Sequence, residues 1–157
     1  MPHYEPWSED RARAVIAEFA HLEGPLMPML HAMQETFGHV PDAVVPMLAE
    51  HLNVSRAEVH GVVTFYHDFR HEPAGQHVLK LCRAEACQAA GGDALAAHAE
   101  QRLGCKLGET TADGRVTVEP IYCLGLCATA PSAMLDGRIV ARLNENRLDK
   151  LITEAQS

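Results

Sequence analysis

Hydrophobic residues between Gly24 and Gly38 recur at the spacing of an α-helix. They lie four, three and four residues apart, at Leu26, Leu30, Met33 and Phe37. This spacing places them on one face and predicts an amphipathic helix that ends at Gly38. Pro28 is compatible with this helix because it falls in the first turn, where a backbone N–H has no intrahelical partner.

Three further helices are predicted in the first half of the chain. Ser8 can cap one of them, another begins near Pro41, and the capping-box pair Ser55 and Glu58 marks the start of the last. Four short helices with short connections predict a small helical bundle, which we place at residues 1–72.

The pattern changes after a cluster of helix-breaking residues at positions 71–75. Short apolar or alternating runs predict strands at residues 77–81, 115–118, 133–135 and 139–141, and Asp136-Gly137 predicts a hairpin between the last two. Two helices are also predicted here. Asp93 is expected to be the N-cap of the first, and Asn144 starts the second. These strands and helices together imply a small α/β domain with a mixed sheet, which we place at residues 76–157. The fold class is therefore α+β.

The cysteines of the second half form two close pairs. They are Cys82-x4-Cys87 and Cys123-x3-Cys127, and each pair follows a predicted strand. Gly91, Gly92 and Gly125 let these loops turn tightly and direct N–H groups toward a bound anion. Four thiolates in such loops can hold a [2Fe–2S] cluster, whose negative charge the N–H groups would stabilise.

The spacing alone leaves other interpretations open. A structural zinc site also uses four cysteines, although its pairs are usually Cys-x2-Cys. Buried or redox-active thiols are a third interpretation. Cys105 stands alone after Gly104 and is expected to be a small core residue.

Composition and charge narrow the classes of function. Asp and Glu number 21 against 13 Lys and Arg, and the net charge of −8 argues against nucleic acid or an anionic membrane surface as a partner. The sequence shows no apolar run of membrane-spanning length and no secretory signal pattern. We therefore expect a soluble, cytoplasmic protein without membrane insertion, whose cysteines serve metal binding or redox chemistry rather than disulfides.

Longer motifs resemble the thioredoxin-like [2Fe–2S] subunit family of NADH-oxidising complexes. They are CLGLCATAP at residues 123–131, TTADGR at 110–115, and GHVP and VHGVVTFY at 38–41 and 59–66. The family includes the small flavin-side subunit of respiratory NADH dehydrogenase, its counterparts in bidirectional hydrogenases, and the gamma subunit of NAD-dependent formate dehydrogenase. CRAEACQ at residues 82–88 looks most like the gamma subunits.

The resemblance implies a helical bundle followed by a thioredoxin-like α/β [2Fe–2S] ferredoxin domain. The cluster ligands carried over from the family are Cys82, Cys87, Cys123 and Cys127. The resemblance also implies that the chain is an electron-transfer subunit, which exchanges electrons with the FMN of a partner NAD(H)-binding flavoprotein. FMN and NAD would then bind the partner, in line with the lack of a Gly-x-Gly-x-x-Gly unit here.

The parent complex implied by residues 82–88 is a soluble NAD-dependent formate dehydrogenase. Formate would then be oxidised on a molybdenum- or tungsten-containing subunit with further iron–sulfur centres, and this chain would hold no catalytic residue. An equivalent subunit of respiratory NADH dehydrogenase or of a bidirectional hydrogenase is the alternative. Two other classes are a zinc-stapled assembly module without redox function and a free ferredoxin-like shuttle.

Overall fold

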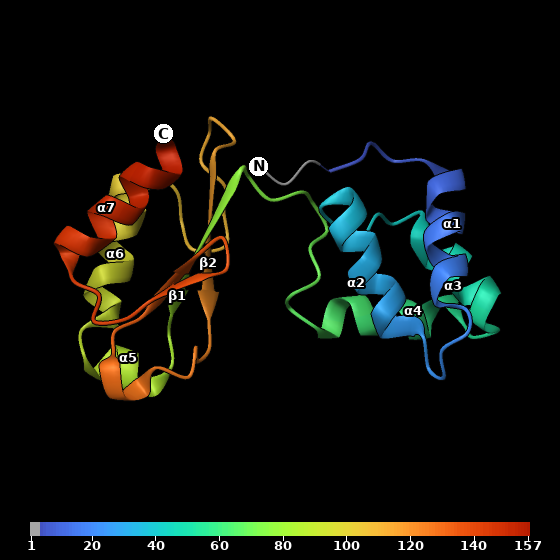
Figure 1. The fold of residues 1–157 in the computed structure, drawn as a ribbon, viewed down its shortest axis with the longest axis horizontal. Coiled ribbons are helices and arrows are strands. Elements are labelled where there is room, and N and C mark those ends of the chain that lie inside the picture. Colours follow the sequence, from blue (N-terminus) through green and yellow to red (C-terminus); the bar gives the residue numbers. More distant parts are fainter. Residues whose placement is uncertain (1–3) are drawn as a thin grey trace. The chain divides into compact units, whose positions relative to one another are not determined.

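The protein has two compact units in a computed structural model that describes residues 4–157. One unit contains the described residues up to Pro73, and the other contains Ala74–Ser157. The two units are described separately below, and Figure 1 labels the seven α-helices of the described residues and the strands β1 and β2.

The first unit consists of short helices. They are α1 (Glu9–Phe19), α2 (Leu26–Phe37), α3 (Val44–Leu52) and α4 (Arg56–Phe65). Of these, α1 and α4 start at the predicted serine caps, whereas α3 starts three residues after Pro41. The predicted capping box is confirmed: the Ser55 hydroxyl accepts the N–H of Glu58 at 3.1 Å, and the Glu58 carboxylate accepts the N–H of Ser55 at 2.8 Å. Gly38 ends α2 in a left-handed conformation, with φ of 79°.

The core of this unit comes from the predicted apolar faces. Its fully buried side chains include Met29, Leu30, Met33, Val44, Leu48 and Val59. The sequence places three aromatic residues, Phe65, Tyr66 and Phe69, at or just after the end of α4. We expect two of them to join this core, but only one does. Phe69 is buried, but Phe65 is 72% exposed and Tyr66 is 45% exposed. Because α4 turns Val63 inward, Phe65, two residues later, falls on the opposite side of the helix.

The second unit contains a four-stranded mixed sheet in the order β2-β1-β3-β4. The strands are β1 (His77–Cys82), β2 (Val116–Ile121), β3 (Ala133–Leu135) and β4 (Arg138–Val140). β1 and β2 are parallel, whereas the β1–β3 and β3–β4 pairs are antiparallel. The predicted hairpin turn is confirmed, since Asp136 and Gly137 both have positive φ between β3 and β4.

Two longer helices cover one face of this sheet. α6 (Gly92–Leu103) and α7 (Glu145–Gln156) lie side by side against β1 (Figure 1). Their inward residues meet those of the strands in one core, which includes Leu79, Val116, Val118, Leu95, Ala99, Leu148 and Ile152. The fold is therefore α+β, as predicted. No helix within residues 4–157 combines the length and the apolar character that a membrane crossing requires.

The start of α6 differs from its prediction. The N-cap is Gly91, with φ of 94°, and Asp93 lies in the first turn, where its carboxylate accepts a hydrogen bond from Arg83 at 2.8 Å. A side chain at Gly92 would meet the carbonyl oxygen of Cys87 at 2.6 Å. The chain therefore turns closely around Cys87 before α6 begins, and Asp93 comes too late to cap the helix.

Candidate metal centre

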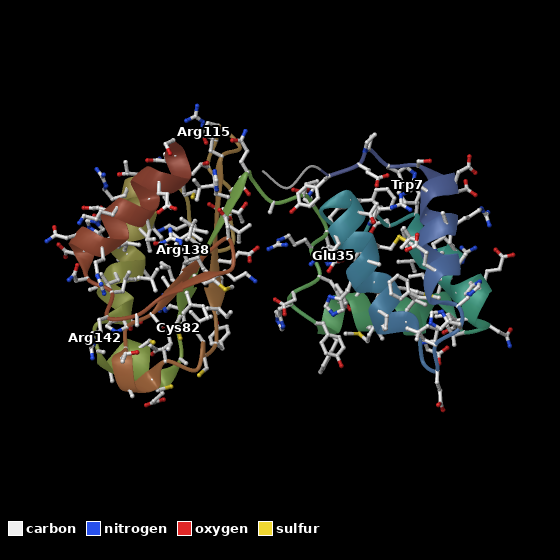
Figure 2. The ribbon with its side chains drawn as sticks, in the orientation of Figure 1. Trp7, Glu35, Cys82, Arg115, Arg138 and Arg142 are labelled. Atoms are coloured by element: carbon white, nitrogen blue, oxygen red, sulfur yellow. The ribbon has the colours of Figure 1, made fainter. Side chains whose placement is uncertain are left out.

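The strand register brings the first and third cysteines to the same edge of the sheet. In the parallel β1–β2 pair, Cys82 lies opposite Ile121, and Cys123 follows two residues later. The loops after both strands therefore leave the sheet side by side, although they are far apart in sequence. Figure 2 labels Cys82 at this end of the second unit, with other side-chain sulfur atoms nearby.

Two short elements that the sequence did not predict carry the remaining cysteines of the pairs. Cys87 lies on α5 (Glu85–Ala89), and Cys127 opens η1 (Cys127–Thr129), a single 3-10 turn. These two elements contact each other at the lower end of the unit in Figure 1. All four cysteines predicted as ligands therefore lie in adjoining segments. Alanine, glutamate and glutamine dominate residues 84–90, and their high helix propensity is the signal that could have revealed α5.

The two pairs differ in exposure. Cys82 and Cys87 are 4% and 2% exposed, whereas the side chains of Cys123 and Cys127 are both exposed. One side of the centre thus faces the interior of the unit, and the other faces outward.

The spacing of the outer sulfurs fits a pair of ligands on one metal ion. Cys123 Sγ and Cys127 Sγ are 3.7 Å apart. Two thiolates bound tetrahedrally at ~2.3 Å from a metal would lie about 3.8 Å apart. Among residues 4–157, no three His, Cys, Asp or Glu side chains converge on one position as ligands of a single ion. The one sulfur pair with a known spacing, Cys123 and Cys127, is therefore placed as two thiolates on one metal ion require.

Backbone N–H groups are directed at the inner sulfur of Cys82. Its burial alone would raise the pKa of this thiol, but hydrogen bonds from the N–H groups of Ala84, Cys123 and Leu124 and from Cys87 outweigh that effect. The pKa of Cys82 is consequently held below its ordinary value. This environment favours the thiolate, the form that binds metal.

The outer loop is shaped to supply another donor. Cys123 has φ of 81°, which is rare for a residue with a side chain, and Gly125 has φ of 78°. The N–H of Gly125 donates to Cys123 Sγ at 3.3 Å. Consecutive N–H groups turned inward by such a loop form a concavity for negative charge.

The four sulfurs also lie within electrostatic reach of one another. The pKa of the Cys127 thiol is raised, first by its hydrogen bond and charge interaction with Cys123, then by burial, and further by the charges of Cys87 and Cys82. Thiolates that repel one another in this way are stabilised when they bind metal cations that lie between them. The donor set therefore fits an iron–sulfur cluster.

Neighbouring polar groups hold the first loop in place. The Arg83 guanidinium pairs with Asp93, the Arg83 N–H donates to the carbonyl of Ile121 at 2.8 Å, and the Gln88 amide donates to the carbonyl of Arg83 at 2.7 Å. Arg83 thus pairs with a carboxylate of its own chain.

The fifth cysteine lies apart from the pairs. Cys105 is partly buried and packs against the hydrophobic core of the second unit, as expected. Its burial, followed by the charges of Glu109 and Glu100, raises the pKa of its thiol. Cys105 therefore takes part in the packing of this core.

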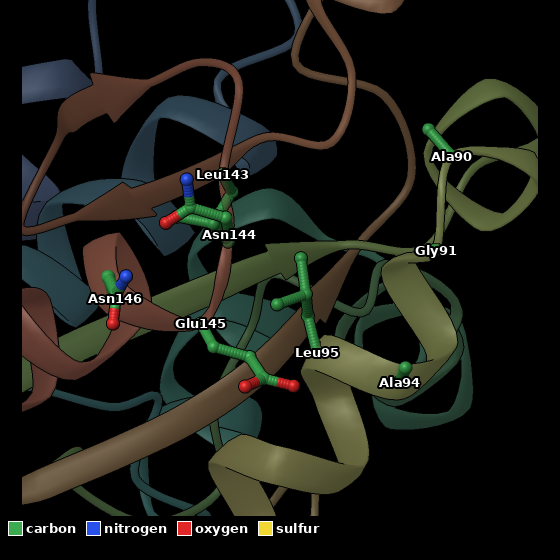
Figure 3. A pocket seen from close by; sticks show the side chains of 8 residues that line it. All are labelled: Ala90, Gly91, Ala94, Leu95, Leu143, Asn144, Glu145 and Asn146. Carbon is green, nitrogen blue, oxygen red and sulfur yellow. The ribbon is translucent and has the colours of Figure 1, made fainter.

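A shallow hollow of about 510 Å³ lies at the starts of α6 and α7. Figure 3 shows its lining, to which Leu95 comes from α6 and Glu145 from α7. Glu145 is the one ionisable side chain in this lining, and none of the paired cysteines belongs to it.

The chain is similar in sequence to a known protein family and to individual members of respiratory and hydrogenase complexes. Residues 12–156 match the family described as thioredoxin-like [2Fe–2S] ferredoxin. A subunit of the NADH-quinone oxidoreductase of Pseudomonas aeruginosa is 36% identical over 132 residues, covering 82% of this chain and 80% of that protein. A subunit of the NADP-reducing hydrogenase of Solidesulfovibrio fructosivorans is 33% identical over 132 residues, covering 84% and 77% respectively.

A solved structure shares the fold. It is that of an NAD⁺-reducing [NiFe]-hydrogenase in the H₂-reduced state, with a TM-score of 0.68 and 28% sequence identity. The likeness covers 81% of this chain but only 22% of the hydrogenase chain, so this protein corresponds to one part of a larger polypeptide there.

Proposed function

The chain belongs to the thioredoxin-like [2Fe–2S] ferredoxin family, and from this membership we propose that its two cysteine pairs hold the family's [2Fe–2S] cluster. The proposed ligands are Cys82, Cys87, Cys123 and Cys127. The main support is the meeting of both pairs at the carboxyl ends of parallel strands, with backbone N–H groups directed at the sulfurs.

We propose that the chain serves as an electron-transfer subunit. When bound, a [2Fe–2S] cluster supplies a site that takes up and releases one electron at a time. The buried cysteines, Cys82 and Cys87, exclude water on the inner side. The exposed pair and the neighbouring Tyr122, which is 74% exposed, leave the outer side open to an electron-transfer partner.

The partner that we propose is an NAD(H)-binding flavoprotein subunit that carries FMN. The relatives support this choice, because their names describe subunits of enzymes that use NADH, NADP or NAD⁺. This chain would accept electrons from the flavin or return them to it, while substrate and nucleotide bind elsewhere in the complex.

The parent complex that we propose is an NAD-dependent formate dehydrogenase. The support is the likeness of residues 82–88 to the gamma subunits of those enzymes. Such a complex adds further iron–sulfur centres and a molybdenum- or tungsten-containing subunit. The relatives from NADH-quinone oxidoreductase and hydrogenase support the alternative, an equivalent subunit in one of those enzymes.

The proposal is tested by isolating the tagged chain anaerobically from the organism that encodes it. We expect a flavoprotein to co-elute in gel filtration, and NADH and formate each to reduce the cluster, as followed by visible absorption and EPR. Reduction of the cluster by NADH and H₂ would instead indicate a bidirectional hydrogenase. Reduction by NADH, but by neither formate nor H₂, would indicate a respiratory NADH dehydrogenase. A colourless, zinc-loaded chain or one that elutes alone would contradict the subunit function.

A further inference from the structure

Ser132 contacts both members of the buried cysteine pair. It lies immediately before β3 and is only 2% exposed. Its hydroxyl oxygen is 3.6 Å from Cys87 Sγ, and its carbonyl accepts the N–H of Cys82 at 3.1 Å. One residue of the second cysteine loop therefore holds the backbone of one inner cysteine and the sulfur of the other.

The direction of the Ser132–Cys87 hydrogen bond follows from the chemistry of a metal-bound cysteine. A coordinating thiolate has no proton, so it can only accept, whereas a serine hydroxyl has one proton to donate. A buried hydroxyl without a partner would be costly, and the sulfur of Cys87 satisfies it. With a cluster in place, the Ser132 hydroxyl donates to the Cys87 sulfur.

The Ser132–Cys87 hydrogen bond stabilises the oxidised and the reduced cluster to different extents. Reduction adds a negative charge that is partly carried by the cysteine sulfurs, so a donor stabilises the reduced state more than the oxidised state. The buried position strengthens this difference because little water screens it. A hydroxyl at this place therefore favours reduction.

Apart from the contact between Cys87 and Cys82, the other donors to these sulfurs are backbone groups, whereas Ser132 donates from its side chain. Cys82 and Cys123 accept hydrogen bonds from backbone N–H groups, which every amino acid except proline supplies. The donor to Cys87 belongs to a side chain, so its presence depends on which residue occupies position 132. This makes it a point at which the sequence can adjust the cluster.

We propose that the Ser132 hydroxyl is a positioning group that raises the reduction potential of the cluster through its hydrogen bond to Cys87. The proposal rests on the proposed function, since it requires Cys87 to be a ligand. It requires no change in the ligands, the fold or the number of electrons, which is one per reduction.

The test is a redox titration of the purified, cluster-containing protein, followed by EPR. Ser132→Ala should keep its iron and its absorption spectrum, while the equilibrium constant for reduction falls about fivefold, as expected from the loss of one modest hydrogen bond. At about 59 mV per factor of ten, this is a potential lower by about 40 mV. Thr129→Ala is the matched control. It removes a hydroxyl from the same loop that donates to the Leu126 carbonyl at 3.3 Å, and its potential should not change.

A second pair of variants covers the case in which Ser132→Ala does not retain its cluster. Ser132→Thr and Ser132→Val differ in one hydroxyl at nearly equal volume, and the threonine variant should have the higher potential. Equal potentials in wild type and Ser132→Ala, or in the threonine and valine variants, would overturn this proposal alone. The Ser132 proposal would also be overturned if all three Ser132 variants failed to bind iron while Thr129→Ala retained it. A wild-type chain without iron would overturn both the Ser132 proposal and the proposed function.

Discussion

Cys82 lies directly opposite Ile121 in the parallel ladder of β1 and β2. Because parallel strands end at the same edge, this register decides that the loops with Cys87 and Cys123 leave the sheet together. The loops then need only short turns, α5 and η1, to bring the four sulfurs together. The sheet is therefore the element that assembles the candidate metal centre.

Replacing a cysteine inside the centre should have a different effect from replacing one outside it. Cys87→Ser should lose or destabilise the cluster, because its buried thiolate is a proposed ligand. Cys105→Ser, which alters a core-packing thiol, should keep the iron and the visible spectrum of the wild type. Iron analysis and absorption spectra of the two purified variants make the comparison. Loss of iron from the Cys105 variant, with iron kept in the Cys87 variant, would mean that the ligands are assigned wrongly.

The turn around Cys87 leaves no room for a side chain at Gly92. In Gly92→Ala the new methyl group would meet the Cys87 carbonyl oxygen at 2.6 Å, so the backbone that carries the ligand must shift. We expect reduced cluster retention, measured as iron per chain after desalting, and a lower melting temperature.

Gly61→Ala is the matched control for Gly92→Ala. Gly61 lies inside α4, and apart from the backbone of its own helix and its chain neighbours no atom lies within 4 Å of the position that an added methyl group would take. Alanine should therefore stabilise the helix by about 0.5–1 kcal/mol. Thermal or urea unfolding reports the change. Equal effects of the two substitutions on iron content would show that the turn around Cys87 is not tightly constrained.

The packing of α7 against the sheet supports the second unit. Leu148 is fully buried in its core, and Leu148→Ala should reduce the free energy of unfolding by about 2–5 kcal/mol. Ile139→Ala removes a similar side chain that is 51% exposed on β4, and it should cost less than about 0.5 kcal/mol. Denaturant unfolding measures both. A cost at Ile139 that matched the cost at Leu148 would mean that another surface covers β4.

The capping box of α4 should make stability depend on pH. The backbone N–H and then the hydroxyl of Ser55 hold the pKa of the Glu58 carboxyl below its ordinary value. A carboxyl with a depressed folded-state pKa adds stability above its unfolded-state pKa, and this contribution disappears as the pH falls through the folded-state pKa. Glu58→Gln should therefore lower the melting temperature at pH 7, and the difference from wild type should shrink between about pH 5 and pH 3.

Two measurements check the Glu58 prediction. Thermal unfolding across this pH range follows the difference between wild type and variant, and carbon-13 NMR of the Glu58 carboxyl gives its pKa directly. A difference in melting temperature that stays constant down to pH 3 would contradict the charge-based account of the cap.

The sequence predicted the elements that depend on local signals. Ser8, Ser55 and Asn144 cap helices as expected, because each side chain accepts an N–H from the first turn regardless of what packs nearby. The Asp136-Gly137 turn follows from backbone preference in the same way. Each of these features depends on a few residues that are adjacent in the sequence.

Features that depend on distant contacts could not be predicted in this way. The five-residue helix α5 is too short to show periodicity; helix propensity is its local signal, but its place is set by packing against η1. Asp93 had the right residue type for an N-cap, but the tight turn at Gly92 moved the helix start ahead of it. The contact of Ser132 with Cys87 joins residues 45 positions apart, and no spacing rule reveals it.

Iron and sulfide analysis with EPR of the anaerobically purified, dithionite-reduced chain tests the central claim most directly. The account predicts about two irons and two inorganic sulfides per chain and a single spin-half signal. A folded chain that carries about one zinc ion, or no metal, and gives no such signal would contradict it.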